Sequence, residues 1–125
     1  MILGIDKLTL ALVTLALDAA SMRHTTIANN IANAGSEDYQ PLRVNFEQQL
    51  GALGTGNVAR TSESTLAGVQ PFVERAPVSD KSGAAVMIDM EMVKLAQNTL
   101  LYRAILAGLG KKMAILSAVV NEGRR

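Results

Sequence analysis

The chain lacks cysteine and tryptophan and has a single histidine among its 125 residues. Without cysteine it can form no disulfide, no thiolate metal site and no cysteine nucleophile. One histidine is too few for a metal centre built from imidazole ligands. No cofactor or metal is therefore expected.

Aromatic side chains and net charge are also scarce. Only four residues are aromatic, although 49% are hydrophobic, so aliphatic side chains, alanine and methionine must form the core, which suits helices that pack along stripes. The net charge of +1 gives no electrostatic reason to expect a nucleic-acid partner. The length allows one domain. Partners should be held by apolar surface rather than by charge, and no small-molecule substrate is expected.

The first hydrophobic run is too short to cross a bilayer, which requires about 20 apolar residues. The stretch Leu8–Leu17 is almost wholly apolar, but Lys7 precedes it and Asp18 closes it. No convincing cleavage site follows, although Ala16 and Ala19 keep a signal peptide open as an alternative. If the protein leaves the cytoplasm, another export route is implied.

Apolar residues spaced by three and four predict one helix from about Asp6 to Ala34, with Gly35 as a left-handed stop. Two apolar stripes lie about 200° apart on this helix, so its first half is apolar nearly all round and must be surrounded. The second stripe contains Leu10, Val13, Leu17, Ala20, His24, Ile27, Ile31 and Ala34.

The periodicity disappears between residues 36 and 85. Val44–Leu50 could form a short helical turn, and the glycine-rich stretch Gly51–Gly68 is typical of a mobile linker. Val69–Val78 could be extended, with Pro71 and Pro77 restricting it to an edge position. An irregular, partly extended middle segment is predicted.

The last third carries the clearest helical pattern, because apolar residues again alternate by four and three. The predicted fold is all-α, with two long terminal helices paired as a coiled-coil-like hairpin and segments at 1–35, 36–85 and 86–125. The stripe of the last helix is Ile88, Met92, Leu95, Thr99, Tyr102, Leu106, Leu109, Met113, Leu116 and Val120.

Each terminal helix carries more apolar surface than the other can cover. On the last helix, Leu101, Ile105, Ile115 and Val119 form a second stripe beside the first. Monomers rarely expose apolar patches beyond a few hundred Å². The uncovered stripes are therefore expected to be intermolecular, with ends that order fully on joining neighbours.

Asp18, Ser21 and His24 are the residue types of a hydrolase triad, but positions three apart on one apolar helix do not shape a cleft. A surface or interface histidine is the better interpretation. An enzyme is not expected.

The motif Ala28-Asn29-Asn30-Ile31-Ala32-Asn33 places three amides on the last turns of an apolar helix. A buried amide without a partner costs about 1–3 kcal/mol. The asparagines could simply cap the helix. Alternatively, they and Tyr39 could fix the register between subunits, as buried polar residues do in coiled coils.

The stretch Ile27–Phe46, with this motif running into Tyr39, resembles the N-terminal signature of the bacterial flagellar rod, hook and hook-filament family. The stretch Asp89–Val120 adds Glu91-Met92, Leu95-Ala96, Asn98, Leu101-Tyr102 and Lys112, which together are most similar to proximal rod subunits. The resemblance covers both terminal thirds, and the short length agrees with it.

The resemblance implies a structural subunit of the basal-body rod in the periplasm. Such proteins are exported through the flagellar type III apparatus without a cleaved signal, and their terminal helices polymerise into a torque-transmitting tube around the export channel. The implied partners are copies of itself, other rod and basal-body proteins, and the membrane-ring and export-gate side of the rod.

Two stretches depart from the family pattern. Ser36-Glu37-Asp38-Tyr39-Gln40 stands where the family has Thr-Pro-Gly-Tyr-Lys, and a type I turn that accepts Asp38 is the expected substitute. Ala84–Met87 replaces the polar residues that usually precede the last helix.

Two alternatives remain beside the rod subunit: an amphipathic membrane-associated protein anchored by Leu8–Leu17, and a helical regulator or secretion chaperone that binds one partner helix. The residues expected at the assembly interface are Leu10, Val13, Leu17, Ile27, Asn29, Asn30, Ile31, Asn33, Tyr39, Met92, Leu95, Asn98, Tyr102, Leu106, Leu109, Met113 and Leu116.

Overall fold

The computed structural model of the chain describes residues 2–54, 62–77 and 88–124, with side chains from Lys7 onward. Two long helices dominate it, α1 at Ile2–Ala32 and α4 at Ile88–Glu122. Short elements lie between them in the sequence: β1 (Leu42–Asn45), α2 (Glu47–Gly54), α3 (Glu63–Leu66) and β2 (Phe72–Arg75). The prediction of a mainly helical chain with a long helix at each end is confirmed.

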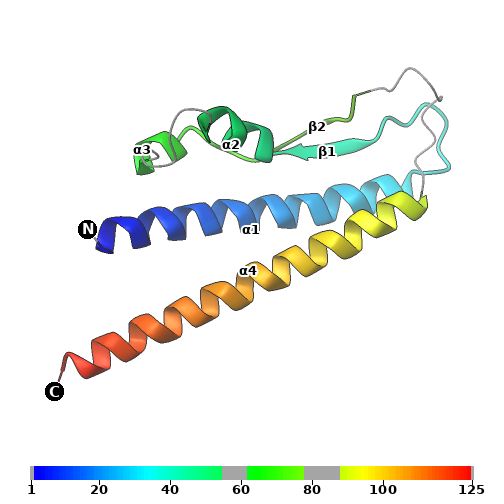
Figure 1. Ribbon diagram of the computed structural model, residues 1–125. Coiled ribbons are helices and arrows are strands. Elements are labelled where there is room, and N and C mark those ends of the chain that lie inside the picture. Colours follow the sequence, from blue (N-terminus) through cyan, green and yellow to red (C-terminus); the bar gives the residue numbers. More distant parts are fainter. Residues whose placement is uncertain (1, 55–61, 78–87, 125) are drawn as a thin grey trace.

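Helix α1 is the middle of three layers (Figure 1). Helix α4 lies on one side of it, and the two strands with α2 and α3 lie on the other. The buried core forms between α1 and the short elements, from Ala19 on α1 with Val44, Phe46 and Val69. This arrangement explains why α1 is apolar nearly all round, because two of its sides are covered by the chain itself.

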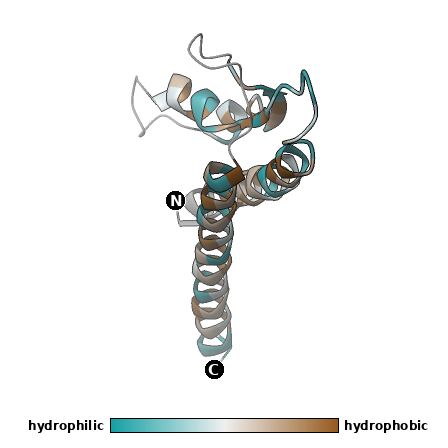
Figure 2. Cartoon of the chain, turned by 90° about the vertical axis from the view of Figure 1, so that its right-hand side faces the viewer, coloured by the Kyte–Doolittle hydropathy of each residue, from teal (hydrophilic) through white to brown (hydrophobic). Residues whose placement is uncertain are grey.

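Helices α1 and α4 run in opposite directions, meet near the end of α1 and the start of α4, and diverge toward the start of α1 and the end of α4 (Figure 1). Viewed at right angles, the second half of α4 stands clear of the other elements (Figure 2). The side chain of Asn98 marks the contact, because its Nδ2 donates to the carbonyl of Ala20 at 2.8 Å. Coiled-coil packing of the two helices along their length stays a prediction.

The chain is not wholly helical, because β1 and β2 pair as a two-stranded antiparallel sheet. Arg43 and Glu74 are partners in the register and form an ion pair at 2.8 Å. The extended stretch predicted within Val69–Val78 is confirmed at β2. The helical turn predicted from Val44 is wrong at its start, since Val44 lies in β1 with its side chain in the core and the helix begins at Glu47.

The linker predicted over Gly51–Gly68 is wrong where the structure describes it, since α2 continues to Gly54 and α3 follows Ser62. Ser62 caps α3 by accepting a hydrogen bond from the Thr65 backbone at 3.3 Å. Leu66 is buried there. Residues 55–61 and the departure at Ala84–Met87 lie outside the described residues.

The connection after α1 turns at Asp38 rather than at Gly35. Asp38 has a φ of 59°, whereas Gly35 does not take a positive φ. The Tyr39 backbone donates to the Ser36 carbonyl at 3.4 Å, which places Asp38 at the third position of a turn. The predicted type I turn is therefore wrong, because that type needs a negative φ at this position. Asp38 takes the left-handed conformation where the family pattern has glycine.

Candidate assembly surface

Asn30 joins three parts of the chain at the end of α1. It is 2% exposed, and its side chain makes four hydrogen bonds. Nδ2 donates to the Leu42 carbonyl at 2.9 Å and to Glu91 Oε2 at 3.1 Å. Oδ1 accepts from the Leu42 backbone N–H and from the Tyr39 hydroxyl, both at 2.9 Å. The amide thus has two donated and two accepted bonds, its full capacity, and fixes β1 and α4 against α1.

A second polar bridge lies about two turns along α4. Asn98 is 5% exposed and, besides its bond to Ala20, accepts a long hydrogen bond from Arg23 Nη1 at 3.5 Å. Arg23 Nη2 also contacts both carboxylate oxygens of Glu47, at 2.7 and 2.9 Å. Arg23 therefore connects α1 with the start of α2 on one side and with α4 on the other.

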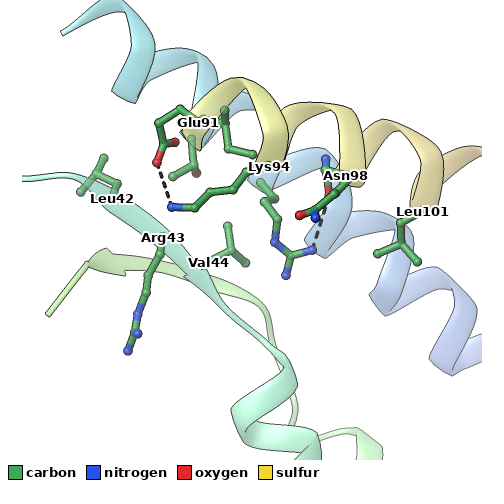
Figure 3. A pocket seen from close by; sticks show the side chains of 11 residues that line it. Leu42, Arg43, Val44, Glu91, Lys94, Asn98 and Leu101 are labelled. Carbon is green, nitrogen blue, oxygen red and sulfur yellow. Dashed lines mark hydrogen bonds and ion pairs between the residues drawn. The ribbon is translucent and has the colours of Figure 1, made fainter. Parts of the chain in front are cut away.

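A groove of about 350 Å³ lies between α1, β1 and the first half of α4 (Figure 3). Three cations line it, namely Arg23, Arg43 and Lys94. Each already pairs with a carboxylate of the same chain: Arg23 with Glu47, Arg43 with Glu74, and Lys94 with Glu91 at 2.9 Å. The groove is thus built from neutralised charge, which suits structural contacts better than capture of an anion.

The other motif residues occupy the end of α1. Asn33 Nδ2 donates to the Asn29 carbonyl at 2.8 Å, so it caps the helix within the chain. Asn29 itself is exposed, Ile27 is buried and Ile31 is half-buried. A register role between subunits stays a prediction for Asn29, Asn30, Asn33 and Tyr39; within the chain, Asn30 and Tyr39 fix the path that leads into β1.

The apolar seam predicted between the terminal helices is open at its far end. Where α1 and α4 diverge, Leu10 and Val13 face Leu109 and Met113 across an apolar wedge of about 420 Å³, which Leu116 also lines. Of the remaining predicted interface residues, Leu17 and Leu95 are half-buried, and Met92, Tyr102 and Leu106 are exposed. The chain therefore covers Leu17 and Leu95 in part and leaves Met92, Tyr102 and Leu106 largely uncovered.

Helix α4 is long and apolar enough to cross a membrane by length and composition alone, and its most apolar stretch is not buried within the chain. Lys111 and Lys112 interrupt the apolar run, and charges near the centre of a bilayer are costly. The stretch Leu8–Leu17, considered above as a membrane anchor, contains Leu15 and Ala16, which pack against the core.

The triad-like residues do not form a site. Asp18, Ser21 and His24 are exposed, and no hydrogen bond joins their side chains in the part of the chain that the structure describes. Ser21 and His24 line a hollow beside Tyr102 on α4, but Asp18 does not. Within residues 2–54, 62–77 and 88–124, no cluster of three acidic or histidine side chains could hold a metal ion.

Two polar residues that hold α4 against α1 are absent from the predicted apolar stripe. Glu91, Leu95 and Asn98 follow the spacing of one helix face, and Glu91 and Asn98 are both buried. The apolar pattern instead assigned Met92 to this face, yet Met92 is 57% exposed. The sequence did contain a signal for this face, because Glu91 and Asn98 stand at helical spacing on either side of Leu95. Arg23 and Glu47 lie on different elements, and no spacing in the sequence connects them.

Comparison with known proteins shows similar sequences, although no family model matches the chain. The flagellar basal body rod protein FlgB of Cereibacter sphaeroides is 30% identical over 115 residues, which cover 86% of this chain and 90% of that protein. The protein of the same name from Bacillus subtilis is 26% identical over 125 residues, with 87% and 90% covered. The similarity therefore extends beyond the two terminal thirds.

Proposed function

Because the chain belongs to the family of the flagellar basal body rod protein FlgB, we propose that it is a structural rod subunit whose long helices bind neighbouring subunits. The supporting observation is the apolar surface of α4 that the chain leaves uncovered. Met113 is exposed on the face of α4 that lines the wedge, and Leu101, Leu106 and Ile115 are exposed elsewhere on the same helix. Such surface is stabilised when other chains bury it, at about 25 cal/mol per Å².

The apolar wedge indicates how neighbours are held. Leu10 and Val13 on α1 and Leu109 on α4 line it together, so a helix from another subunit could pack against both long helices at once. Repeated around an axis, this packing would make a coiled-coil-like tube of terminal helices around the export channel. The partners are copies of this chain and other rod and basal-body proteins, including those at the membrane-ring and export-gate side.

Export through the flagellar type III apparatus, without cleavage of a leader, belongs to the same proposal. The apolar stretch Leu8–Leu17 is part of α1, and its residues Leu15 and Ala16 pack against the hydrophobic core. Its removal would take away part of the core and the α1 side of the wedge. The assembled subunit would lie in the periplasmic part of the basal body.

The proposed role is mechanical, and the subunit performs no chemical reaction. The buried polar groups support this role, since Asn30, Glu91 and Asn98 are occupied in contacts between elements of the chain. A rod that transmits torque requires subunits whose elements do not shift against one another, and satisfied buried networks favour one rigid arrangement.

Replacement of Leu109 by Asp tests the proposal, because it places a charge inside the apolar wedge. In cells that lack the native protein, the Leu109→Asp variant should be synthesised but should not support rod assembly or swimming. Leu53→Asp is the matched control, since Leu53 is an exposed leucine on α2, away from the wedge. Normal swimming with Leu109→Asp would contradict the assignment of the wedge.

A further inference from the structure

One exposed stripe on the last three turns of α4 has a distinctive order of side chains. Lys111, Ile115, Val119 and Glu122 follow one another at spacings of four, four and three, which keeps them within an arc of about 80°. All four are exposed, Ile115 at 65% and Val119 at 61%. The stripe therefore reads basic, apolar, apolar, acidic along the helix.

Among the residues that the structure describes, none pairs with this stripe. Ile115 lies about 100° around α4 from Asn98, which faces α1. Lys111 and Glu122 are about 16 Å apart along the helix axis, too far to pair with each other. Neither belongs to an ion pair among the described residues, whose ion pairs are Arg23–Glu47, Arg43–Glu74 and Lys94–Glu91. Figure 2 shows this half of α4 extending away from the other elements.

The stripe is complementary to itself when it is reversed. If two copies of α4 lie antiparallel, Lys111 of each copy meets Glu122 of the other, and Ile115 meets Val119. One two-fold axis creates all four contacts, as an isologous interface requires. Each Lys111 would also lie near the last turn of the other helix, where the helix dipole favours a cation.

We propose that a second copy of this chain docks on the stripe, so that the α4 helices of two free subunits pair antiparallel over residues 111–122. This contact goes beyond the rod role, since it is a pairing of subunits outside the rod that covers apolar surface until assembly. The overlap is about 17 Å long, so the interface falls below the ~1,200 Å² of standard complexes and a dissociation constant on the order of 100 μM is expected.

The order of charges favours a second copy over a lipid surface. An anionic membrane attracts a helix whose polar residues are basic, whereas this stripe ends in Glu122. A membrane also gives no reason for a lysine four residues before, and a glutamate three residues after, two β-branched residues on one face. Two-fold pairing of two copies explains both the acidic residue at the end of the stripe and the position of the two charges on either side of the apolar pair.

Charge reversal in the full-length chain tests the proposal by sedimentation velocity between about 10 μM and 1 mM. The unaltered chain should show a monomer–dimer equilibrium that stops at two copies. Lys111→Glu and Glu122→Lys, each alone, should weaken dimerisation about tenfold, because each replaces two attractions by two repulsions. The double variant Lys111→Glu/Glu122→Lys should restore it. Arg103→Glu is the matched control, since this exposed cation lies about 120° around the helix from Ile115 and should leave dimerisation unchanged.

The absence of native cysteine allows the orientation to be tested as well. Mixed Ile115→Cys and Val119→Cys chains should oxidise to the 115–119 cross-link faster than either variant cross-links with itself, and a parallel pair would reverse that order.

The proposal is overturned by a monomer at 1 mM, by association that continues beyond two copies, or by equal sensitivity to Arg103→Glu. Binding to phosphatidylglycerol vesicles without dimerisation would assign the stripe to lipid and overturn it too. None of these measurements depends on rod assembly.

Discussion

At the scale of single residues, Asn30 combines the roles of a strand partner and a helix contact. Its amide meets both the N–H and the carbonyl of Leu42, as a neighbouring strand would, and it also reaches Glu91 on α4. A side chain at the end of α1 thereby determines where the sheet begins and where α4 starts. Few other residue types could meet these four groups, because a carboxylate lacks the donors and an alkyl group lacks both functions.

Asn30→Ala should lower the free energy of unfolding by about 2–3 kcal/mol, because it leaves buried groups around Leu42 and Glu91 without partners. Urea denaturation followed by circular dichroism measures this change. Asn29→Ala, one residue earlier and exposed, should change stability by less than about 0.5 kcal/mol. Equal effects of the two substitutions would show that the Asn30 contacts do not stabilise the fold.

Asp38→Gly should stabilise the protein by about 0.5–1 kcal/mol, since glycine adopts a positive φ without the steric cost that a Cβ imposes. The gain is limited because glycine also has more freedom in the unfolded chain. Glu37→Gly, in the same turn without a positive φ, should be destabilising. Thermal melts of the three proteins would compare them. A lower melting temperature for Asp38→Gly would indicate that the aspartate side chain contributes more than the backbone conformation costs.

Sequence alone could predict that Asn30 is an important residue, but it could not predict which residues Asn30 contacts. The cost of a buried amide identifies Asn30 from sequence, because an asparagine on an apolar helix needs a partner. The partners Leu42 and Glu91 lie 12 and 61 residues away, and no local pattern connects them with Asn30. The left-handed Asp38 could have been inferred from the family pattern, which has glycine at that position.

At the scale of elements, α4 contains two glycines in the middle of a helix. A Cβ added at Gly108 or Gly110 would meet nothing within 4 Å, so the folded chain itself does not require glycine there. Glycine in a helix interior costs about 1 kcal/mol relative to alanine. Gly108 lines the apolar wedge, where a neighbouring helix could approach the backbone closely.

Gly108→Ala should therefore raise the stability of the isolated chain by about 0.5–1 kcal/mol while it reduces rod assembly. Gly110→Ala, which does not line the wedge, should give a similar gain in stability without the loss of assembly. Urea denaturation and a swimming assay measure the two effects separately. Unimpaired swimming with Gly108→Ala would exclude close backbone approach at that position.

The long elements could be predicted from periodicity, and the short ones could not. Helices α1 and α4 repeat their apolar spacing over many turns, so local exceptions such as Glu91 and Asn98 do not hide them. Strand β1 has only four residues, so its alternation of buried and exposed side chains is too short to be distinguished from the beginning of helix α2. Its position is determined by contacts with Asn30 and with β2 across the sheet.

At the scale of the whole molecule, burial is concentrated at one end. The buried residues lie on α1 between Ala19 and Asn30, in the short elements and the residues that adjoin them, and on α4 at Glu91 and Asn98. From residue 100 to residue 124, no described residue is buried. The second half of α4 is therefore expected to be the least stable part of the described fold.

Amide hydrogen exchange should show this gradient in the free chain. Amides of α1 from about Ala19 to Asn30 and of α4 from Glu91 to Asn98 should be protected far longer than those after residue 100. In the assembled rod, amides after residue 100 should gain protection, because neighbours then cover them. Uniform protection along α4 in a dilute monomer would argue against uncovered apolar surface as the basis of assembly.

The surplus of apolar surface inferred from sequence was correct for α4 and overestimated for α1. One stripe of α1 was expected to be left over for other chains, yet Leu15, Ala19 and Met22 on α1 pack in the core that Val44, Phe46 and Val69 form. Sequence patterns count apolar residues but do not show which segment covers them. The middle segment has no periodicity of its own, so the sequence gave little indication that it covers one side of α1.

The start of α1 and the end of α4 both lie at the diverging end of the molecule, beside the apolar wedge (Figure 1). An epitope tag or fluorescent protein fused to either terminus would therefore sit at the mouth of the proposed contact with neighbours. Helices α2 and α3 lie on the other side of α1 from α4 (Figure 1). A label intended to follow this subunit in living cells is better inserted there, between Gly54 and Ser62.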